Sequence, residues 1–332
     1  MTLDTDIAAN YDPVFIVGMN GSGTTMLLDC LNNHPMLYGF RGETRIIPYF
    51  ISKTPAYGDL TNDNNFLKLW NDFRNDPIFV ACNNGVAPDL PINWRNKERT
   101  IGAIIDGVFQ FFASQDNKQR WCEKTPMSAL HMTKIANVYP QAKFIHMIRD
   151  GRDCAVSFNR RWGYSSKRTI CRWKEVISKA QQQAKSLSSH YLEVRYEDLT
   201  SKPELWMQRI CNFLDVEYNE KVLYLSRNQA HSGSKQKRIT ENKSRWKSYY
   251  SDNTLVHLEK IAGKRLHSLG YTTSNPTGDS NPAKIVKAYL ALHDLVYAVK
   301  NKMELIRKKT KYGFRAQLTA ALRQIITNRL PR

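Results

Sequence analysis

The chain has 332 residues, of which 42% are hydrophobic, enough for one large α/β domain with extensions or for two small domains. Its formal net charge of +19 predicts a surface that attracts anions, among them phosphorylated nucleotides, acidic glycans, anionic lipid and nucleic acid. The six cysteines form no C-x-x-C pair, which argues against a disulfide framework and a zinc site. We find neither a signal peptide nor an apolar run of about 18 residues, so a reducing, cytoplasmic setting is expected.

The first informative segment has the order strand, Gly-rich turn, helix. Residues 14–18 are apolar and predict a buried strand, and a helix is expected over 24–33. Gly18 and Gly23 have the G-x-x-x-x-G spacing of a P-loop, but Thr24 stands where a nucleotide triphosphatase carries its lysine. Backbone N–H groups next to a helix N-terminus predict an anion site. A tight turn whose glycines serve only the backbone is the alternative.

Further along the chain, apolar spacing predicts alternating strands and helices. This alternation favours an α/β fold with a doubly wound parallel sheet, P-loop-like and flanked by helices. Ligands of such sheets bind beyond the carboxyl ends of the strands, so segments 18–25, 123–126 and 149–153 are expected to crowd around one crevice. We predict strands at 143–148, at 191–194 and from 120 into a loop by 126, and helices at 65–73, 101–114, 129–138, 173–189, 204–214 and 255–269. A further helix is expected to follow the turn at 149–153 and to end at about 161.

The C-terminal part differs in composition from the rest. Residues 274–282 are rich in Pro, Gly, Ser and Asn and are expected to be a linker between a domain at 10–273 and a tail at 283–332. From residue 284 on, the chain has 12 Lys and Arg but only two acidic residues, and its segments have amphipathic helical spacing. Such a helical basic tail is expected to lie on an anionic membrane surface or to serve as an oligomerisation or packing element.

Three groups of residues are candidates for chemistry. Arg149, at a strand end, and Ser157 can reach one phosphate, although an Arg-Asp-Gly-Arg-Asp string is also typical of a surface salt-bridge cluster. Glu43, flanked by Arg41 and Arg45, has the chemistry of a general base, with a plain ion pair as the alternative. Lys124 can stabilise charge on a leaving oxygen or can be an exposed lysine.

Taken together, these segments resemble the sulfotransferases that use 3′-phosphoadenosine 5′-phosphosulfate (PAPS), nearest in wording to the tyrosylprotein type and its bacterial relatives. The resemblance covers about 13–272 and rests on six motifs in the family's order. These motifs are Ser22-Gly23-Thr24-Thr25, His34-Pro35, Gly42-Glu43-Thr44-Arg45-Ile46-Ile47-Pro48, Glu123-Lys124-Thr125-Pro126, Arg149-Asp150-Gly151-Arg152 with Ser157, and Arg195-Tyr196-Glu197-Asp198-Leu199.

The resemblance implies a role for each matching position. Glu43 matches the catalytic base, Lys124 a lysine beside the transferring group, and Arg45 lies on the substrate side. No metal is implied, because the phosphosulfate carries less charge than a triphosphate. The matching cofactor-binding residues are Asn20, Gly21, Ser22, Gly23, Thr24, Thr25, Arg149, Ser157, Arg161, Tyr196, Arg245 and Trp246.

Two positions depart from the family pattern. The family places Lys or Arg immediately before Ser-Gly-Thr-Thr, where this chain has Gly21. Another cation must then supply the charge, and Arg41, Arg45, Lys124 and Arg245 are candidates. In secretory relatives the cysteine matching Cys122 is disulfide-bonded, but its partner position holds no cysteine here, in agreement with a reducing compartment.

The predicted function is transfer of a sulfuryl group from PAPS to a hydroxyl, with Glu43 as general base. A saccharide or glycolipid acceptor, bound by an acceptor-side insertion at 49–100, is the first expectation, and a peptide tyrosine is the alternative. A P-loop nucleotide kinase is a lower alternative that Thr24 argues against. We predict no nucleic-acid partner, because no known binding motif is present. The expected location is cytoplasmic, with peripheral membrane attachment through the tail left open, as is the oligomeric state.

Overall fold

The computed structural model describes residues 12–40, 42–83, 85, 88–225, 238–283, 288 and 292. Two compact units divide the chain. The first contains the residues up to Gly18 together with 23–147 and 179–241. The second contains 19–22, 148–178 and the residues from 242 on.

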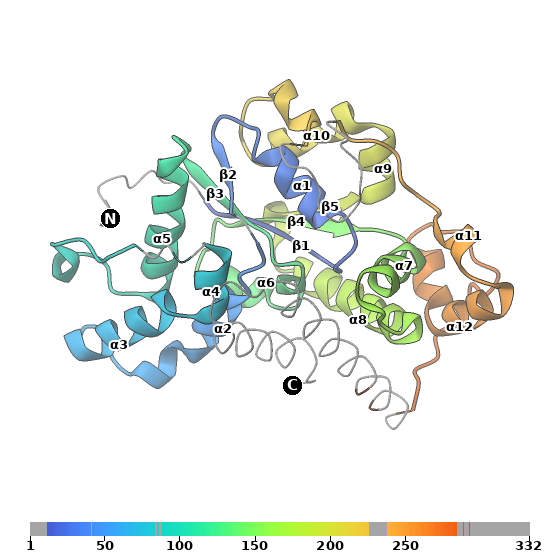
Figure 1. The fold of residues 1–332 in the computed structure, drawn as a ribbon, viewed down its shortest axis with the longest axis horizontal. Helices are drawn as coiled ribbons and strands as arrows, with labels where there is room; N and C mark the ends of the chain where they lie inside the picture. The colour runs from blue at the N-terminus through green and yellow to red at the C-terminus, as the bar shows by residue number, and fades with distance from the viewer. Residues whose placement is uncertain are drawn as a thin grey trace, which may run out of the picture. The chain divides into compact units, whose positions relative to one another are not determined.

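A five-stranded sheet with the order β2-β3-β1-β4-β5 is the frame of the first unit (Figure 1). β1 pairs in parallel with both β3 and β4, and β2 pairs in parallel with β3. β1 is a wholly buried apolar run, and β4 is buried apart from half-buried Lys143, as expected of strands covered on both sides. The strands are β1 (Val14–Gly18), β2 (Leu37–Gly39), β3 (Arg120–Glu123), β4 (Lys143–Ile148) and β5 (Tyr191–Arg195).

Helices of the first unit accompany these strands. They are α1 (Thr24–Leu31), α2 (Ile46–Lys53), α3 (Asp63–Arg74), α4 (Pro77–Cys82), α5 (Ile101–Gln115), α6 (Met132–Ala136), α9 (Tyr196–Ser201) and α10 (Pro203–Phe213). Short 3₁₀ turns are η1 (Thr54–Tyr57), η2 (Trp94–Asn96), η3 (Pro126–Leu130), η4 (Ser188–His190) and η5 (Glu220–Leu223). The predicted insertion thus contains α3, α4 and two 3₁₀ turns, with the Asn62 side chain capping α3.

Both faces of the sheet are covered. Val14 and Ile16 of β1 belong to a core that also contains buried residues of α1, α9 and α10. Phe15 points the other way, where it stacks on Phe144 at 5.4 Å between ring centroids and meets Trp121 edge-on at 5.5 Å. Trp121 in turn lies 4.7 Å from the ring of Phe109 in α5. The predicted doubly wound α/β sheet is therefore confirmed.

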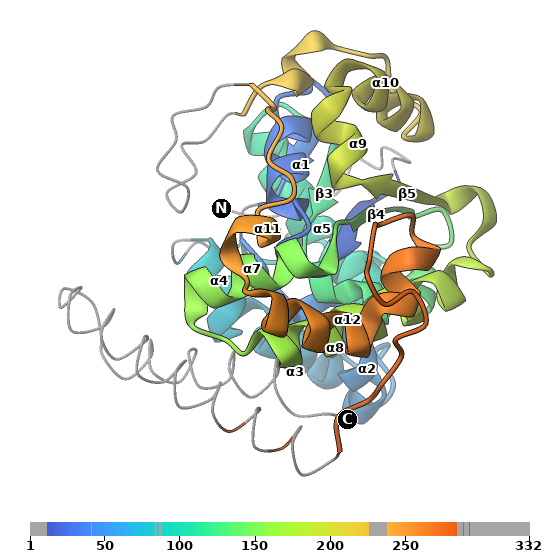
Figure 2. The ribbon, with the colours of Figure 1, turned by 90° about the vertical axis from the view of Figure 1, so that its right-hand side faces the viewer.

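Helices make up the second unit, where α7, α8 and α12 lie side by side (Figure 2). Trp173 of α8 donates from its indole to Arg149 O at 2.9 Å. Its ring fills the space beside Gly151, where a Cβ would lie 2.5 Å away. The helices are α7 (Gly151–Trp162), α8 (Ser166–Ala184, which runs on into the first unit), α11 (Trp246–Tyr249) and α12 (Asp252–Ser268).

The segment 273–280, which we name the strap, is bonded along α12. Ser274 N donates to Glu259 Oε2 at 2.8 Å, and Ser280 N donates to Lys260 O at 2.9 Å. Gly263 admits this close approach, because a Cβ there would lie 1.8 Å from Asn275 O. The residues predicted as a linker thus make regular contacts with a helix, and the domain boundaries stay a prediction.

Some elements differ from the sequence prediction. β2 was not predicted, because three residues show no periodicity, and neither was α2. The helix expected at 129–138 is split, since His131 has φ −135° and separates η3 from α6. The helix expected at 173–189 begins earlier, at Ser166, because Thr169 and Ile170 extend its buried stripe.

The predicted basic tail lies outside the described residues, apart from 283, 288 and 292. Its helices and its contact with a membrane or a partner therefore stay predictions. In the part of the chain that the structure describes, no helix has the length and apolar character needed to cross a bilayer.

Candidate active site

The turn after β1 has the geometry of an anion-binding loop. Ser22 N donates to Met19 O at 3.0 Å, and α1 begins at Thr24 with Gly23 as its N-cap. Gly21 and Gly23 have φ of +89° and +98°, left-handed values that glycine adopts without a Cβ clash. The order strand, Gly-rich turn, helix is thus confirmed.

Two predicted cofactor residues pack on this turn, each within its own unit. A Cβ at Gly21 would lie 3.2 Å from Ser157 Cβ in α7. A Cβ at Gly23 would lie 2.4 Å from Cδ2 of Tyr196, the first residue of α9. Both glycines are therefore needed for close approach as well as for backbone conformation.

A buried hydroxyl tests whether the turn fits a phosphate. Ser22 is 1% exposed, and among the described residues its Oγ has no hydrogen-bond partner. A buried hydroxyl without a partner in a Gly-rich turn is free to donate a hydrogen bond to a ligand oxygen. Neighbouring Thr24 is buried and Thr25 is exposed, while Asn20 is half-buried. These residues fit the phosphosulfate of PAPS.

Arg149 joins the turn to two other parts of the second unit. Its Nη1 donates to Gly21 O at 3.1 Å, and its Nη2 donates to Asn242 O at 2.7 Å. Asp153, one turn into α7, lies 3.6 Å from Nη2. Arg149 is 6% exposed, and its guanidinium is held against Gly21, on which Ser157 also packs. A buried guanidinium at this place fits the predicted 3′-phosphate site.

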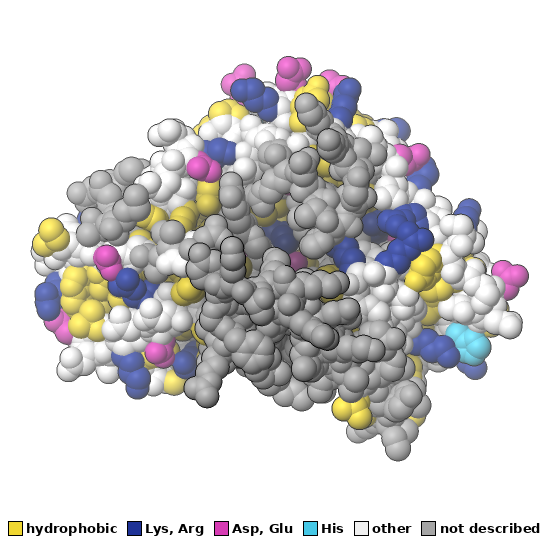
Figure 3. Space-filling view, viewed as in Figure 1, with side chains coloured by type: hydrophobic (Ala, Val, Ile, Leu, Met, Phe, Trp, Pro, Cys, Tyr) yellow, Lys and Arg dark blue, Asp and Glu magenta, His cyan; other side chains and the backbone are white. Residues whose placement is uncertain are grey.

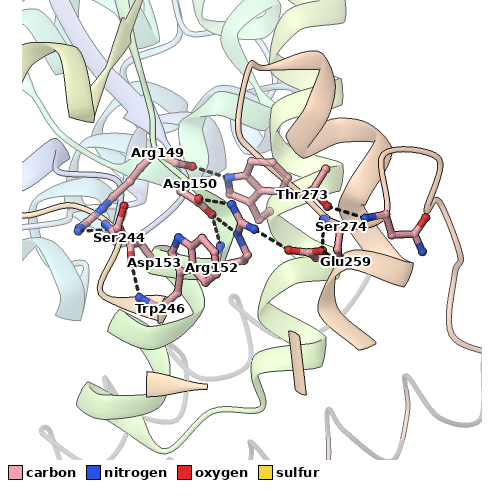
Figure 4. A network of polar contacts seen from close by, with 11 residues as sticks. Arg149, Asp150, Arg152, Asp153, Ser244, Trp246, Glu259, Thr273 and Ser274 are labelled. Carbon is pink, nitrogen blue, oxygen red and sulfur yellow. Dashed lines mark hydrogen bonds and ion pairs between the residues drawn. The ribbon is translucent and has the colours of Figure 1, made fainter. Parts of the chain in front are cut away.

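The Arg-Asp-Gly-Arg-Asp string is not a surface cluster. Arg152 is 1% exposed and donates to both carboxylate oxygens of Asp150, at 2.7 and 3.0 Å, and to Glu259 Oε1 at 2.6 Å (Figure 4). The salt-bridge alternative was right about the pairing and wrong about the location. Sequence spacing could not reveal Glu259, which lies more than one hundred residues away.

Three further predicted cofactor residues lie in the second unit. Arg161 is exposed in the last turn of α7, and Arg245 is the N-cap of α11. Trp246 places its ring 3.7 Å from the guanidinium carbon of Arg152. Lys and Arg side chains gather over α7 on the face shown in Figure 3, in line with an anionic ligand.

Glu43 lies between two cations. Its Oε1 accepts from Lys124 Nζ at 3.1 Å, and its Oε2 accepts from Arg45 Nη2 at 3.0 Å. Burial raises the pKa of Glu43, but the charges and hydrogen bonds of Lys124 and Arg45 outweigh it, so the pKa is lower than usual. The carboxylate is therefore ionised at neutral pH, and Lys124, with 5% of its side chain exposed, is not a surface lysine.

A second carboxylate, Glu123, links the segments that carry Glu43 and Lys124, the predicted catalytic residues. Its Oε1 accepts from the hydroxyls of Thr44, at 3.1 Å, and Thr125. Thr125 Oγ1 in turn accepts from Arg45 N at 3.2 Å, and Arg45 has a left-handed φ of +56°. Burial raises the pKa of Glu123 to about 7. The sequence contained one signal of this role, a carboxylate at the end of a predicted strand and next to Lys124.

The missing family cation has a structural explanation. Gly21 cannot carry a long basic side chain without strain, because its φ is +89° and Ser157 lies against it. Lys124 and Arg45 are both ion-paired with Glu43. Arg41 lies outside the described residues. Which cation compensates stays a prediction.

Other sequence expectations concern metals and cysteines. In the part of the chain that is described, no cluster of three or more His, Cys, Asp or Glu side chains has the arrangement of a metal site. All six cysteines are described and free, Cys122 among them.

The structure thus brings the predicted residues together in two groups. The first unit assembles Glu43, Lys124 and Arg45, and separately Gly23 and Tyr196. The second unit assembles Gly21, Arg149 and Ser157. That both groups face one crevice stays a prediction.

Comparison with known proteins decides the family. The model of the sulfotransferase family matches residues 13–220. The chain belongs to the sulfotransferase family. This match includes Glu43, Lys124, Arg149 and Ser157, and confirms the family that the motifs indicated.

Several relatives of this sulfotransferase are known. A putative protein-tyrosine sulfotransferase of Caenorhabditis briggsae is 28% identical over 290 residues, which cover 80% of this chain and 91% of that protein. Protein-tyrosine sulfotransferase 1 of Danio rerio is 26% identical over 237 residues, 67% of this chain and 59% of that protein. The sulfotransferase domain of the Synechococcus PCC 7002 olefin synthase shares the fold, with a TM-score of 0.50 and 21% identity over 76% of this chain and 94% of that domain.

Proposed function

We propose that this sulfotransferase moves the sulfuryl group of PAPS to the hydroxyl of a tyrosine in a peptide or protein. The observation that carries the proposal is Glu43, an ionised carboxylate held between Lys124 and Arg45. The relatives named as protein-tyrosine sulfotransferases support a tyrosine acceptor more directly than the saccharide or glycolipid that the sequence favoured.

The chemistry of Glu43 also favours a phenol. A carboxylate whose pKa is lowered by two cations is a weak base. A tyrosine hydroxyl has a pKa of about 10, and a sugar hydroxyl is less acidic. Glu43 can therefore share the proton of a phenol more readily than that of a saccharide.

Each group of residues has a task in this proposal. When bound, PAPS supplies the sulfuryl group and a leaving phosphate oxygen. Ser22 and the loop amides would hold the phosphosulfate, while Arg149 and Ser157 would hold the 3′-phosphate. Lys124 Nζ, which donates to Glu43 in this structure, would donate to the leaving phosphate oxygen. Glu43 would accept the proton of the acceptor hydroxyl. Positioning and electrostatic stabilisation then supply most of the rate.

A transfer assay tests both the donor and the acceptor. Purified protein is incubated with radiolabelled PAPS and a tyrosine peptide, the same peptide with phenylalanine, a panel of saccharides, and a glycolipid. Label is expected on the tyrosine peptide alone. Transfer to carbohydrate but not to tyrosine would overturn the acceptor. Failure to bind adenosine 3′,5′-bisphosphate (PAP), or a requirement for ATP and magnesium, would overturn the function.

A further inference from the structure

Residues 242–246, which we name the clasp, are hydrogen-bonded to the Asp153 carboxylate of α7. Ser244 N donates to Asp153 Oδ2 at 2.9 Å, and Trp246 N donates to Asp153 Oδ1 at 3.0 Å (Figure 4). The Asp153 side chain is fully buried. One buried carboxylate therefore accepts two charge-assisted hydrogen bonds and fixes the backbone of Ser244 and Trp246.

The clasp is held in a conformation that it does not favour by itself. Ser244 has φ +58°, in the left-handed region where a residue with a Cβ is strained. Such a residue persists only where its surroundings determine it. The bonds to Asp153 on either side of the Ser244 side chain provide that determination.

Arg149 connects the clasp to the phosphate turn. One guanidinium nitrogen donates to Asn242 O of the clasp, and the other donates to Gly21 O of the turn. Asp153 lies 3.6 Å from the first of these nitrogens. A residue that holds the clasp therefore also holds the guanidinium that would receive the 3′-phosphate.

The other side of the clasp rests on a rigid base. The Trp246 ring covers the guanidinium of Arg152 at 3.7 Å. Arg152 is fixed by Asp150 and by Glu259 of α12, and Ser274 of the strap donates to the same Glu259 carboxylate. Movement of the clasp thus requires loss of the Asp153 bonds, of the Arg149 bond to Asn242 O and of the Trp246 contact.

We propose that Asp153 is a positioning residue, whose carboxylate holds the clasp closed beside Arg149 and thereby slows the release of the bound nucleotide. This inference rests on the proposed function in that the nucleotide is PAP or PAPS. It assigns a role to Asp153, which would not bind the nucleotide itself, because a carboxylate repels a phosphate.

That repulsion makes the test directional. If Asp153 acted only through its charge, its neutralisation beside Arg149 would strengthen the binding of an anionic nucleotide. If it acts by holding the clasp, neutralisation weakens binding. Asp153→Asn suits this test, because an amide can accept only one of the two N–H groups and turns a donor toward the other.

Binding of PAP is measured by calorimetry, and its dissociation by stopped flow, for wild type, Asp153→Asn and the control Asp116→Asn. Asp116 is an exposed residue at the end of α5, and its substitution changes the net charge equally. We expect Asp153→Asn to weaken PAP binding about 10- to 100-fold, mostly through faster dissociation, with kcat at saturating PAPS changed less. Binding as tight as in wild type, or tighter, would overturn the inference.

Ser244→Gly supplies a rescue. Glycine adopts the left-handed conformation without strain, so it favours the closed clasp. We expect Ser244→Gly to slow PAP dissociation and to recover part of the loss in Asp153→Asn. If Asp153→Asn does not fold, the single variant Ser244→Gly decides, and unchanged or faster dissociation in it counts against the clasp.

A measurement without nucleotide separates this inference from the proposed function. Hydrogen exchange of the peptides covering 242–246 is expected to be at least about tenfold faster in Asp153→Asn than in wild type or Asp116→Asn. Equal exchange overturns the clasp even if PAP binds. Faster exchange in a protein that binds no PAP overturns the proposed function and leaves Asp153 as the residue that holds the clasp.

Discussion

Glu43 in the first unit and Arg149 in the second unit are both charged residues held by hydrogen bonds, but their partners differ in kind. Glu43 is paired with two side chains of opposite charge. Arg149 donates to the uncharged backbone carbonyls of Gly21 and Asn242, and Asp153 lies 3.6 Å from its Nη2. In the proposed function, the first arrangement tunes a proton acceptor, and the second supplies a cation for the 3′-phosphate. Substitutions in the two regions should therefore affect different steps.

The largest effect is expected for Glu43→Gln. An amide cannot accept the hydroxyl proton, so kcat should fall by about 10² to 10⁴. Loss of the negative charge leaves Lys124 and Arg45 without their carboxylate, so PAP should bind as tightly as in wild type or more tightly. Steady-state rates and calorimetry measure the two quantities. The exposed Glu204→Gln serves as the control, and a parallel loss of PAP binding would contradict the separation of the two regions.

Arg149→Lys tests the other side of the comparison. Lysine keeps the charge but cannot donate from two fixed nitrogens to Gly21 O and Asn242 O. We expect the Kd for PAP to rise about 10- to 100-fold, with a smaller change in kcat at saturating PAPS. Arg149→Ala should weaken binding further. A normal Kd combined with a low kcat in Arg149→Lys would place Arg149 with the transfer chemistry instead.

Gly21→Ala should have a smaller effect, and it addresses the missing family cation. The methyl group meets both an unfavourable φ and the Ser157 side chain at 3.2 Å. PAP binding is expected to weaken about tenfold. Gly85→Ala is a matched control, since Gly85 has φ +85° but no atom of the described residues lies within 4 Å of its Cβ position. Tighter PAP binding by Gly21→Arg would show that the turn accepts the family's basic residue, contrary to this structure.

A different kind of effect, on folding instead of binding or catalysis, is expected as a dependence of stability on pH through Glu123. Its pKa rises from 4.5 to about 7 on folding, because burial disfavours its charge. Its contribution is therefore fully present below pH 4.5 and is lost as the pH rises to about 7, by roughly 3 kcal/mol. Glu123→Gln has no such group. Denaturant unfolding between pH 4.5 and 8 should show wild type losing stability relative to Glu123→Gln, and parallel curves would contradict the shift.

The sequence predicted best what depends on local pattern. The predicted bounds of β4 are the same as those in the structure, because its mostly apolar sequence is typical of a short buried strand. The turn at 18–25 was predicted from glycine spacing and a following helix. β2 was missed, because its three residues are a strand only through pairing with β3. The start of α8 was missed, because Ser166 and Lys167 give no helical signal by themselves.

Motifs in the sequence were enough to propose the site residues, but not to predict the contacts that these residues make. Motif order pointed to Glu43, Lys124 and Arg149. The contacts that give them their properties join distant segments, such as Thr44 with Glu123 or Arg152 with Glu259. Asp153 was visible only as the last letter of a charged string. Its function as a double acceptor depends on backbone that comes ninety residues later in the chain.

The strap has a practical consequence for shortening this protein. A chain ended before Ser274 would lose the donors to Glu259, the acid that fixes Arg152 beneath Trp246. The backbone of Gly263, which Asn275 of the strap covers, would then be exposed. A chain ended after Ser280 keeps every one of those bonds, including that of Ser280 to Lys260. A shortened protein for crystallisation, or for comparison with the full chain in tests of the basic tail, should therefore extend through residue 280.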